Sequence, residues 1–337
     1  MRHYCTYFDR NYLVRGLSLL ASLQRHARPF RLWVLCLDDA TYEALEHLAG
    51  EELARIRLEE LEREQPELLQ ARDDGRSRFE YYFTLTPCLS RSMLDRADSV
   101  TYLDADLYLF SSPEEAFQEI GEASVAIVEH RFTARAQERE ALHGRFNVGW
   151  LTFRDDPQAR ACLARWREQC LASCSEDAAT GHFGDQKYLD DWPERWPGVV
   201  VLRHPGLDVG PWNLDARALS RASGGWTTAG RPLICYHFHG IRGLGGRVLD
   251  TGLGYYGVPL TSPVRRLYAE YLAEWSRQGA FGVAPARGGG VMPWLRAARD
   301  GGLVVRVGGE LWPLGLGRLG HLASRDVLRR VIGRSPA

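Results

Sequence analysis

The chain has 337 residues, 45% of them apolar, and its 42 basic side chains are balanced by 43 acidic ones. This composition excludes a disordered or fibrous protein and predicts a globular one, with a large domain and an appendage or with two domains. The net charge of −1 gives no reason to expect a nucleic-acid partner. No run of 18 apolar residues is free of charge, and residues 1–5 hold no apolar signal core, so we expect a cytoplasmic protein without a transmembrane span.

Strands and helices alternate over the first fifty residues. Apolar runs at residues 3–8 and 31–37 each end at acidic residues and are followed by leucines and tyrosines at helical spacing. This rhythm predicts an α/β fold with a mostly parallel sheet flanked by helices.

The elements that follow are less regular. Charged residues dominate the segment 59–77, which we interpret as a solvated helix and loop. The remaining expected elements are helices at residues 79–94 and 159–171, and strands at residues 99–110, 123–128, 146–153, 199–202 and 233–240.

The composition changes after residue 262. A helix is expected at residues 263–278, and a segment rich in glycine, proline and alanine follows it. From residue 263 onward the chain holds 12 arginines against 5 acidic residues. We therefore predict one domain over residues 1–262 and a small, basic, mainly helical C-terminal appendage over residues 263–337. Such an appendage suits peripheral contact with an anionic membrane surface, with apolar contacts from Trp294, Leu295, Trp312 and Leu314.

Seven cysteines are spread along the chain. An odd number of scattered cysteines argues against a disulfide framework. The cluster of Cys162, Cys170 and Cys174 raises the alternative of a zinc site, but it lacks a close-spaced pair, and we interpret it as helix packing.

Two acidic residues interrupt an apolar run. On a strand, Asp104 and Asp106 would project to one side and Ala105 to the other. Two carboxylates held close together repel, and a divalent cation relieves that repulsion. The flanking residues Leu103 and Leu107 indicate a buried element, where uncompensated charge is expensive. The pair therefore predicts a Mg²⁺ or Mn²⁺ site, and its alternative is a strand-end turn with solvated carboxylates.

Two histidines stand in the last predicted strand of the first domain. His237 and His239 are two positions apart and would share one side of that strand. One of them is expected as a metal ligand and the other as a donor to a phosphate. An imidazole beside carboxylates shifts the preference from Mg²⁺ toward Mn²⁺.

Five short motifs follow one another along the chain: Tyr102-Leu103-Asp104-Ala105-Asp106, Asn147-Val148-Gly149, Asp185-Gln186, Trp212-Asn213 and His237-Phe238-His239-Gly240. Their order and spacing, over residues 3 to about 245, resemble family eight of the GT-A glycosyltransferases. That family includes glycogenin and bacterial lipopolysaccharide galactosyl- and glucosyltransferases. No single motif is specific, but five in this order are.

The resemblance implies a GT-A fold and a role for each motif. Asp104, Asp106 and His237 would hold Mn²⁺ (or Mg²⁺) at the diphosphate of a nucleotide sugar. Asp185 and Gln186 would lie next to the anomeric carbon and the acceptor hydroxyl as catalytic residues; their alternative is an N-cap and the first turn of a helix. Contacts with the nucleotide-sugar donor are expected from Tyr7, Asp9, Arg78, Asn147, Gly149, Trp212, Asn213, His239, Gly240 and Arg242.

Two of these matches depart from the family's pattern. Arg242 occupies the neighbourhood in which the family has a lysine that pairs with the diphosphate. Arg78 matches only loosely the family's basic residue upstream of the two acidic residues.

The expected activity is transfer of a hexose from a nucleotide diphosphate sugar, uridine-linked by preference, to a glycan, lipid-linked or protein acceptor. Retention of anomeric configuration is inherited from the resemblance. A haloacid dehalogenase phosphatase would need Thr or Val where Tyr108 stands. A sugar nucleotidyltransferase would need a glycine-rich loop that residues 5–16 lack. The alternatives that remain are a sugar nucleotidyltransferase and a non-catalytic nucleotide-sugar-binding protein on the same fold.

Overall fold

The computed structural model describes residues 1–177, 183–245, 248–278, 303–307 and 310–313. By its internal contacts the chain divides into two compact units. The first consists of residues 1–208 and 233–236, and the second of residues 209–232 and the chain from residue 237 onward. The domain boundary at residue 262, which rests on composition, stays a prediction.

A seven-stranded sheet forms the centre of the first unit. Its spatial order is β3-β2-β1-β4-β7-β6-β8, and β7 runs antiparallel to both of its neighbours while the remaining neighbours pair in parallel. This arrangement confirms the α/β class and the mostly parallel sheet. The strands are β1 (Arg2–Phe8), β2 (Phe30–Cys36), β3 (Leu53–Arg57), β4 (Ser99–Leu103), β6 (Val125–Glu129), β7 (Phe146–Arg154) and β8 (Val199–Leu202).

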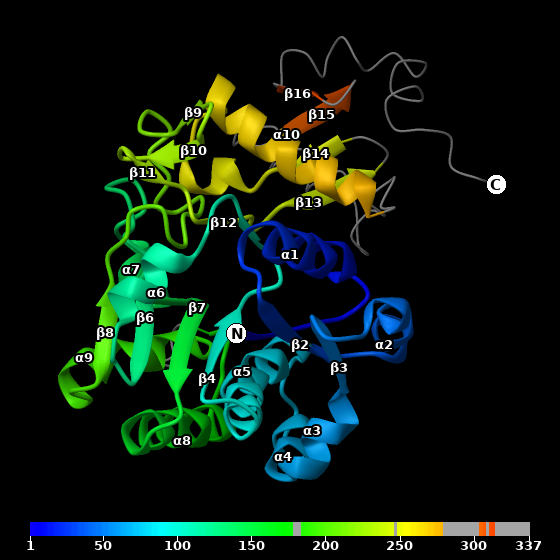
Figure 1. Cartoon of the computed structure of the whole chain (residues 1–337), viewed down its shortest axis with the longest axis vertical. Coiled ribbons are helices and arrows are strands. Elements are labelled where there is room, and N and C mark those ends of the chain that lie inside the picture. The colour runs from blue at the N-terminus through cyan, green and yellow to red at the C-terminus, as the bar shows by residue number, and fades with distance from the viewer. Residues whose placement is uncertain (178–182, 246–247, 279–302, 308–309, 314–337) are drawn as a thin grey trace. The chain divides into compact units, whose positions relative to one another are not determined.

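Helices cover both faces of this sheet (Figure 1). The near-continuous apolar sequences of the strands fit burial on two sides. One core joins the sheet to α3 (Leu58–Glu64), α4 (Glu67–Asp73), α5 (Arg78–Leu94), α8 (Pro157–Ala172) and α9 (Trp192–Arg195), and a second core joins the sheet to α1 (Leu13–His26) and α6 (Glu114–Ile120). The short elements α2 (Asp39–Ala44), η1 (Glu46–Leu48), α7 (Arg139–His143) and η3 (Gln186–Asp191) complete this unit.

The start of α5 is fixed by a capping box. The Ser77 hydroxyl accepts from the Glu80 amide (3.2 Å), and the Ser77 amide donates to the Glu80 carboxylate (2.8 Å). This reciprocal pair satisfies two backbone donors at the helix end. It sets Arg78 as the first helical residue of α5.

The acidic residues lie in a turn and not on a strand. The expected strand over residues 99–110 breaks after Leu103, and β5 (Leu107–Leu109) begins on the far side of the turn. The turn is closed by the Leu107 amide, which donates to the Asp104 carbonyl (3.0 Å). The alternation of side chains along a strand therefore does not apply to Asp104 and Asp106.

Strand β5 leaves the main sheet and pairs with β12 (Cys235–His237). The Phe110 amide, just after β5, donates to the carbonyl of Ile234, just before β12 (2.8 Å). The two strands therefore run in opposite directions, and the end of β12 lies beside the start of β5.

The second unit contains two small sheets and a helix. Its described elements are β9 (Ser220–Ala222), β10 (Gly225–Thr228) and β11 (Arg231–Pro232) in one sheet, β13 (Arg242–Gly245), β14 (Val248–Asp250), β15 (Leu303–Val307) and β16 (Glu310–Pro313) in the other, together with η4 (Leu253–Tyr256) and α10 (Ser262–Arg277).

Helix α10 confirms the helix expected at residues 263–278. Beyond residue 278 the described residues form β15 and β16, and the mainly helical character of the appendage stays a prediction. Trp294, Leu295 and Leu314, expected to contact a membrane, lie outside the described residues, and Trp312 belongs to β16.

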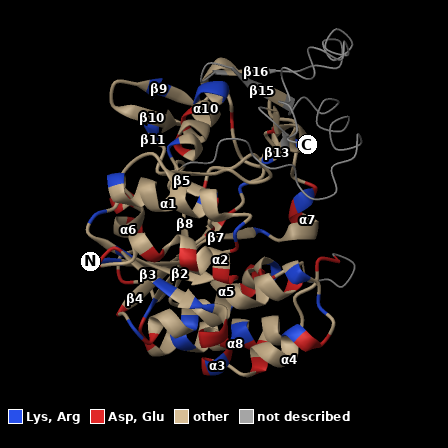
Figure 2. Cartoon of the chain, turned by 90° about the vertical axis from the view of Figure 1, so that its right-hand side faces the viewer, with Lys and Arg blue, Asp and Glu red and all other residues tan. Residues whose placement is uncertain are grey.

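Charges of both signs are interspersed over the helices of the first unit (Figure 2). Many of them pair, as Arg160 does with Asp95 (2.7 Å) and with Asp155. Across the described part of the chain, no helix combines the length and apolar character that a bilayer crossing requires.

Candidate functional site

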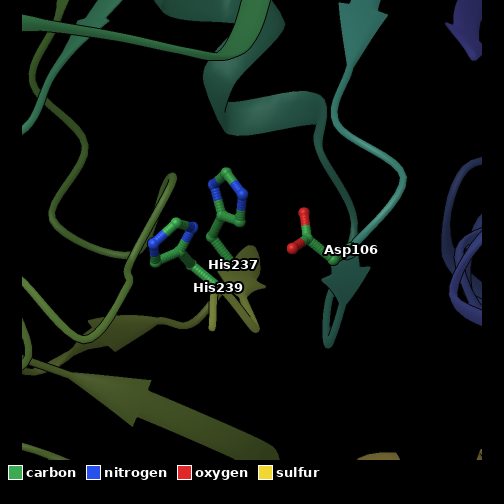
Figure 3. Close-up of side chains that lie close together, drawn as sticks. All are labelled: Asp106, His237 and His239. Atoms are coloured by element: carbon green, nitrogen blue, oxygen red, sulfur yellow. The ribbon is translucent and has the colours of Figure 1, made fainter. Parts of the chain in front are cut away.

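One carboxylate and two imidazoles gather where β5 and β12 meet (Figure 3). The ligand atoms offered by Asp106, His237 and His239 all lie within 4.8 Å of one another. Asp106 and His237 are buried and His239 is exposed. Asp106 directly precedes β5 and His237 is the last residue of β12, so the strand pair accounts for their meeting.

This set has the chemistry of a divalent-metal site. Imidazole together with carboxylate suits Mn²⁺ and other first-row divalent ions. Of the residues that the structure describes, no other three histidine, cysteine or acidic side chains are grouped closely enough to hold a metal ion. Asp106, His237 and His239 therefore form a candidate metal centre, two of whose members are in the predicted metal set.

Asp104, the third predicted ligand, lies outside this group of three. Its carboxylate accepts a hydrogen bond from the Tyr102 hydroxyl (2.8 Å), and its backbone amide donates to the Gly149 carbonyl (3.1 Å). His239 takes its place in the group. The spacing of the two histidines was the available signal for His239, although it follows β12 and does not belong to it.

Aromatic rings fix the two imidazoles. The Trp212 ring meets the His237 and His239 rings edge-on, with centroids 5.1 and 5.9 Å away. The centroid of the Tyr256 ring lies 6.2 Å from the ring centroids of both Trp212 and His239. The predicted Trp212 is thus next to the histidines. Asn213 supports the turn that carries Trp212, because its side-chain oxygen accepts from the Gly210 amide (2.9 Å).

Gly240 and Arg242 follow the histidines. Gly240 has φ +78°, a conformation that favours glycine. Arg242 begins β13, and its guanidinium pairs with Asp250 on β14 (3.3 Å). The arginine expected near a phosphate is therefore held by a carboxylate of its own sheet.

The structure brings the predicted residues Asp9 and Arg78 into direct contact. Arg78 donates to the Asp9 carboxylate through its guanidinium and to the Tyr82 hydroxyl through Nε (2.6 Å). The amide and side chain of Asn11 also donate to Asp9 (2.9 and 3.0 Å). Asp9 thus anchors the turn after β1 and holds the arginine.

Asp185 is a deeply buried carboxyl group. Burial raises its pKa to about 7, a hydrogen bond from Thr86 opposes that rise, and the charge of Asp104 adds to it. Its Oδ2 has no hydrogen-bond partner among the described residues. Tyr7, whose hydroxyl lies 3.3 Å from Thr86 Oγ1, has its pKa raised by burial and by the Asp185 charge. Tyr7, Asp104 and Asp185 are therefore electrostatic neighbours.

Gln186 follows Asp185 at the start of η3 and is tied to α7. Its side-chain amide donates to the His143 carbonyl (2.8 Å). The backbone carbonyl of Asp185 accepts from the Trp166 indole (2.8 Å). Asp185 stands at the N-cap position of η3 and Gln186 in its first turn, as the capping alternative has it, but the Asp185 side chain makes no capping hydrogen bond.

Asn147 and Gly149 lie on β7, beside the acidic turn. The Asn147 side-chain oxygen accepts from the Gly149 amide (2.6 Å), and its Nδ2 lies 3.1 Å from His130 Nε2. Sequence reasoning missed His130, because a single histidine after an apolar strand carries no motif and its partner lies 17 positions away.

The three clustered cysteines belong to the core. Cys162, Cys170 and Cys174 are free and buried. Burial raises the pKa of Cys162 and of Cys170. A thiol that resists ionisation is a poor metal ligand, and the packing interpretation accounts for all three.

No protein-family model matches the chain. Two proteins of Bacillus subtilis (strain 168) are similar to it over most of its length. Uncharacterized protein YfnD is 30% identical over 280 residues, which cover 82% of this chain and 89% of YfnD. Uncharacterized protein YfnF is 31% identical over 249 residues, which cover 71% of this chain and 81% of YfnF.

Two solved structures are also similar to it. Mouse xyloside xylosyltransferase 1, in its apo form, matches with a TM-score of 0.47 and 17% identity over 71% of this chain and 98% of that one. Galactosyltransferase LgtC, in complex with donor and acceptor sugar analogs, matches with a TM-score of 0.46 and 17% identity over 71% of this chain and 87% of that one.

Proposed function

This chain belongs to the same protein family as YfnD and YfnF of Bacillus subtilis, and from its candidate site we propose that it is a metal-dependent glycosyltransferase of the GT-A type. It transfers a hexose from a nucleotide diphosphate sugar, with UDP as the nucleotide, to a hydroxyl of a glycan, lipid-linked or protein acceptor. The observation that carries the proposal is the meeting of Asp106, His237 and His239 at the junction of β5 and β12.

The candidate metal centre supplies the first requirement of this reaction. Departure of a nucleoside diphosphate concentrates negative charge on its phosphates. Asp106, His237 and His239 would hold Mn²⁺, which, when bound, offsets that charge. Trp212 keeps the two imidazoles in place while the diphosphate binds.

The turn after β1 supplies a place for the nucleotide. Arg78, the first residue of α5, brings a guanidinium group to this turn, where Asp9 and the Tyr82 hydroxyl fix it. A held guanidinium binds phosphate or ribose oxygens with less loss of side-chain freedom than a mobile one. In this proposal Asp9 acts by positioning Arg78 and the turn, and Tyr7 lines the floor of the same place.

The sugar is proposed to lie between the acidic turn and η3. Asp185 is buried and, with its pKa raised to about 7, is about half protonated at pH 7, so its carboxyl group is suited to donate as well as accept hydrogen bonds with sugar hydroxyls. Gln186 would contact the reacting carbon or the acceptor hydroxyl. Retention of configuration is part of the proposal and rests on the resemblance alone.

Purified full-length protein with a panel of nucleotide sugars and Mn²⁺ tests the proposal. We expect release of nucleoside diphosphate, slowly to water and faster with an acceptor sugar. Asp106→Asn should lower the rate by about two to three decades, because it removes a charged ligand of the ion. The readout is the diphosphate product, followed by chromatography with Mn²⁺ and with EDTA.

The control is Asp156→Asn. Asp156 caps α8 by accepting from the Ala159 amide (2.9 Å), and asparagine caps a helix equally well. This variant should keep full activity. Donor binding without turnover would instead establish the non-catalytic alternative. Formation of a nucleoside triphosphate and a sugar 1-phosphate when pyrophosphate is added to the nucleotide sugar would establish a nucleotidyltransferase.

A further inference from the structure

His130 is a buried histidine just after β6, beside the candidate site but outside the candidate metal centre. Its Nδ1 lies 3.1 Å from the Gly144 carbonyl oxygen, and its Nε2 lies 3.1 Å from Nδ2 of Asn147. The Phe132 ring stacks on it, with centroids 4.6 Å apart and planes 16° from parallel. The imidazole is therefore held in one orientation by contacts on its edges and on its face.

The hydrogen bonds assign both the amide and the tautomer. The Gly149 amide can only donate, so the Asn147 atom that faces it at 2.6 Å must be the oxygen. The Asn147 amide nitrogen must then face His130, whose Nε2 has to accept. The proton of the ring lies on Nδ1 and is donated to the Gly144 carbonyl. Burial lowers the pKa of His130 to about 4, so the ring is neutral at pH 7.

This path of hydrogen bonds reaches two parts of the candidate site. At one end, the Gly149 carbonyl accepts from the amide of Asp104 in the acidic turn (3.1 Å). At the other end, Gly144 follows His143, whose carbonyl accepts from Gln186 (2.8 Å). The acidic turn and Gln186 are thus connected through one buried imidazole and one side-chain amide.

We propose that His130 is a positioning residue that, as the neutral Nδ1–H tautomer, fixes the side-chain amide of Asn147 and with it the register of Gly149, the acidic turn and the loop carrying Gln186. Its contribution to turnover rests on the function proposed above. Its contribution to local order does not.

The physical reason is that the side-chain amide of Asn147 needs His130 as a hydrogen-bond acceptor. An apolar side chain at position 130 would leave a buried amide N–H without an acceptor, and such a group is destabilising. The amide would turn toward other partners, and its hydrogen bond with Gly149 would be lost with it. Gly149, whose carbonyl accepts from the Asp104 amide, would then be held less firmly, and the acidic turn with it.

The first test measures local order in the full-length protein without metal or nucleotide. In ¹⁵N NMR spectra of histidine-labelled protein at pH 7, His130 should show a protonated Nδ1 and an unprotonated Nε2. In His130→Leu, the amide hydrogens of Gly149 and Asp104 should exchange with solvent at least about tenfold faster. An Nε2–H tautomer, or unchanged exchange at both amides, would overturn the proposal.

Two further variants separate positioning from general stability. His204 is also buried and hydrogen-bonded, to Glu115 and to the Gly206 amide, but lies outside the path. His204→Leu should lower the melting temperature without changing exchange at Gly149 and Asp104. His130→Gln retains an acceptor for Asn147 and should restore much of the protection that His130→Leu loses. Equal loss of protection in all three variants would mean that His130 is only a packing residue.

A second readout concerns the site itself. By calorimetric titration, His130→Leu should bind Mn²⁺ about 10- to 100-fold more weakly than the wild type, the usual effect of removing a group that orients metal-site residues. Weaker exchange protection with unchanged Mn²⁺ affinity would refute the link to the metal centre. If the wild type binds no Mn²⁺, the proposed function fails, while the NMR result still decides the role of His130.

Discussion

At the scale of single residues, Asp185 illustrates how the candidate site is set apart from the rest of the core. Burial raises the pKa of this carboxyl to about 7, against an ordinary value of 3.8. The folded protein therefore holds the proton more tightly than the unfolded chain does. Asp185 destabilises the fold increasingly as the pH rises from about 4 to 7, and the penalty is constant above that range.

Asp185→Asn should consequently stabilise the metal-free protein, most strongly at alkaline pH. Three pKa units correspond to about 4 kcal/mol at pH 8 and to roughly half of that or less at pH 5. Urea unfolding at the two pH values measures the difference. An advantage that does not change with pH would show that the carboxyl is not the source of the penalty. The same variant should lose turnover if Asp185 contacts the sugar as proposed.

Individual site residues differ in how far the sequence predicts them. Asp106 and His237 carry chemistry that is rare in buried elements, so their types and motifs predict a metal site. Nothing predicts the contact between Asp9 and Arg78, because they lie 69 positions apart. The role of His130 cannot be predicted from the sequence for the same reason, because it depends on which atoms of Asn147 and Gly144 reach it in three dimensions.

At the scale of elements, the turn between α7 and β7 connects His130 to Gln186. Gly144 ends α7 with φ +91°, and a Cβ added there would lie 3.1 Å from an Asp190 carboxylate oxygen and 3.2 Å from the Cα of Lys187. Backbone strain and close contact therefore both oppose a side chain at this position.

Gly144→Ala should lower the free energy of unfolding by about 1–3 kcal/mol and should increase amide exchange at Gly149 as well. The matched control is Gly75→Ala. Gly75 has φ +81°, but a Cβ added there would meet nothing within 4 Å, so this variant isolates the backbone strain. Guanidinium unfolding of both variants measures the two contributions. Equal destabilisation by both would mean that the contact with η3 carries no weight.

The elements themselves were predicted where periodicity is strong. Strands such as β2 are apolar along their length, and helices such as α10 repeat their apolar residues at helical spacing, so local sequence specifies both. The break between β4 and β5 was not predicted, because apolar residues continue on both sides of the acidic turn. Strands β15 and β16 were missed: β15 pairs with the distant β14, and β16 pairs with β15.

At the scale of the whole molecule, ligand binding should raise the free energy of unfolding. An ion and a nucleotide that bind only the folded protein stabilise it by about 2.7 kcal/mol at one hundred times the dissociation constant. For a chain of 337 residues this corresponds to a rise in melting temperature of roughly 4 °C.

Thermal denaturation with UDP and Mn²⁺ together should show this rise, whereas UDP with EDTA should show little of it. Asp106→Asn should show little of it under either condition. A rise of equal size with EDTA would contradict the role of the ion, because the nucleotide would then bind without it.

The pairing of β5 with β12 determines when the candidate metal centre can come into being. The hydrogen bond from the Ser111 hydroxyl to the Leu233 carbonyl in this pairing joins residues 122 positions apart. During synthesis on the ribosome, Asp106 emerges long before the histidines that complete the set. A nascent or prematurely terminated chain that stops before β12 would therefore hold Asp106 without its two histidines, and under the proposed function metal binding would report that translation has passed His239.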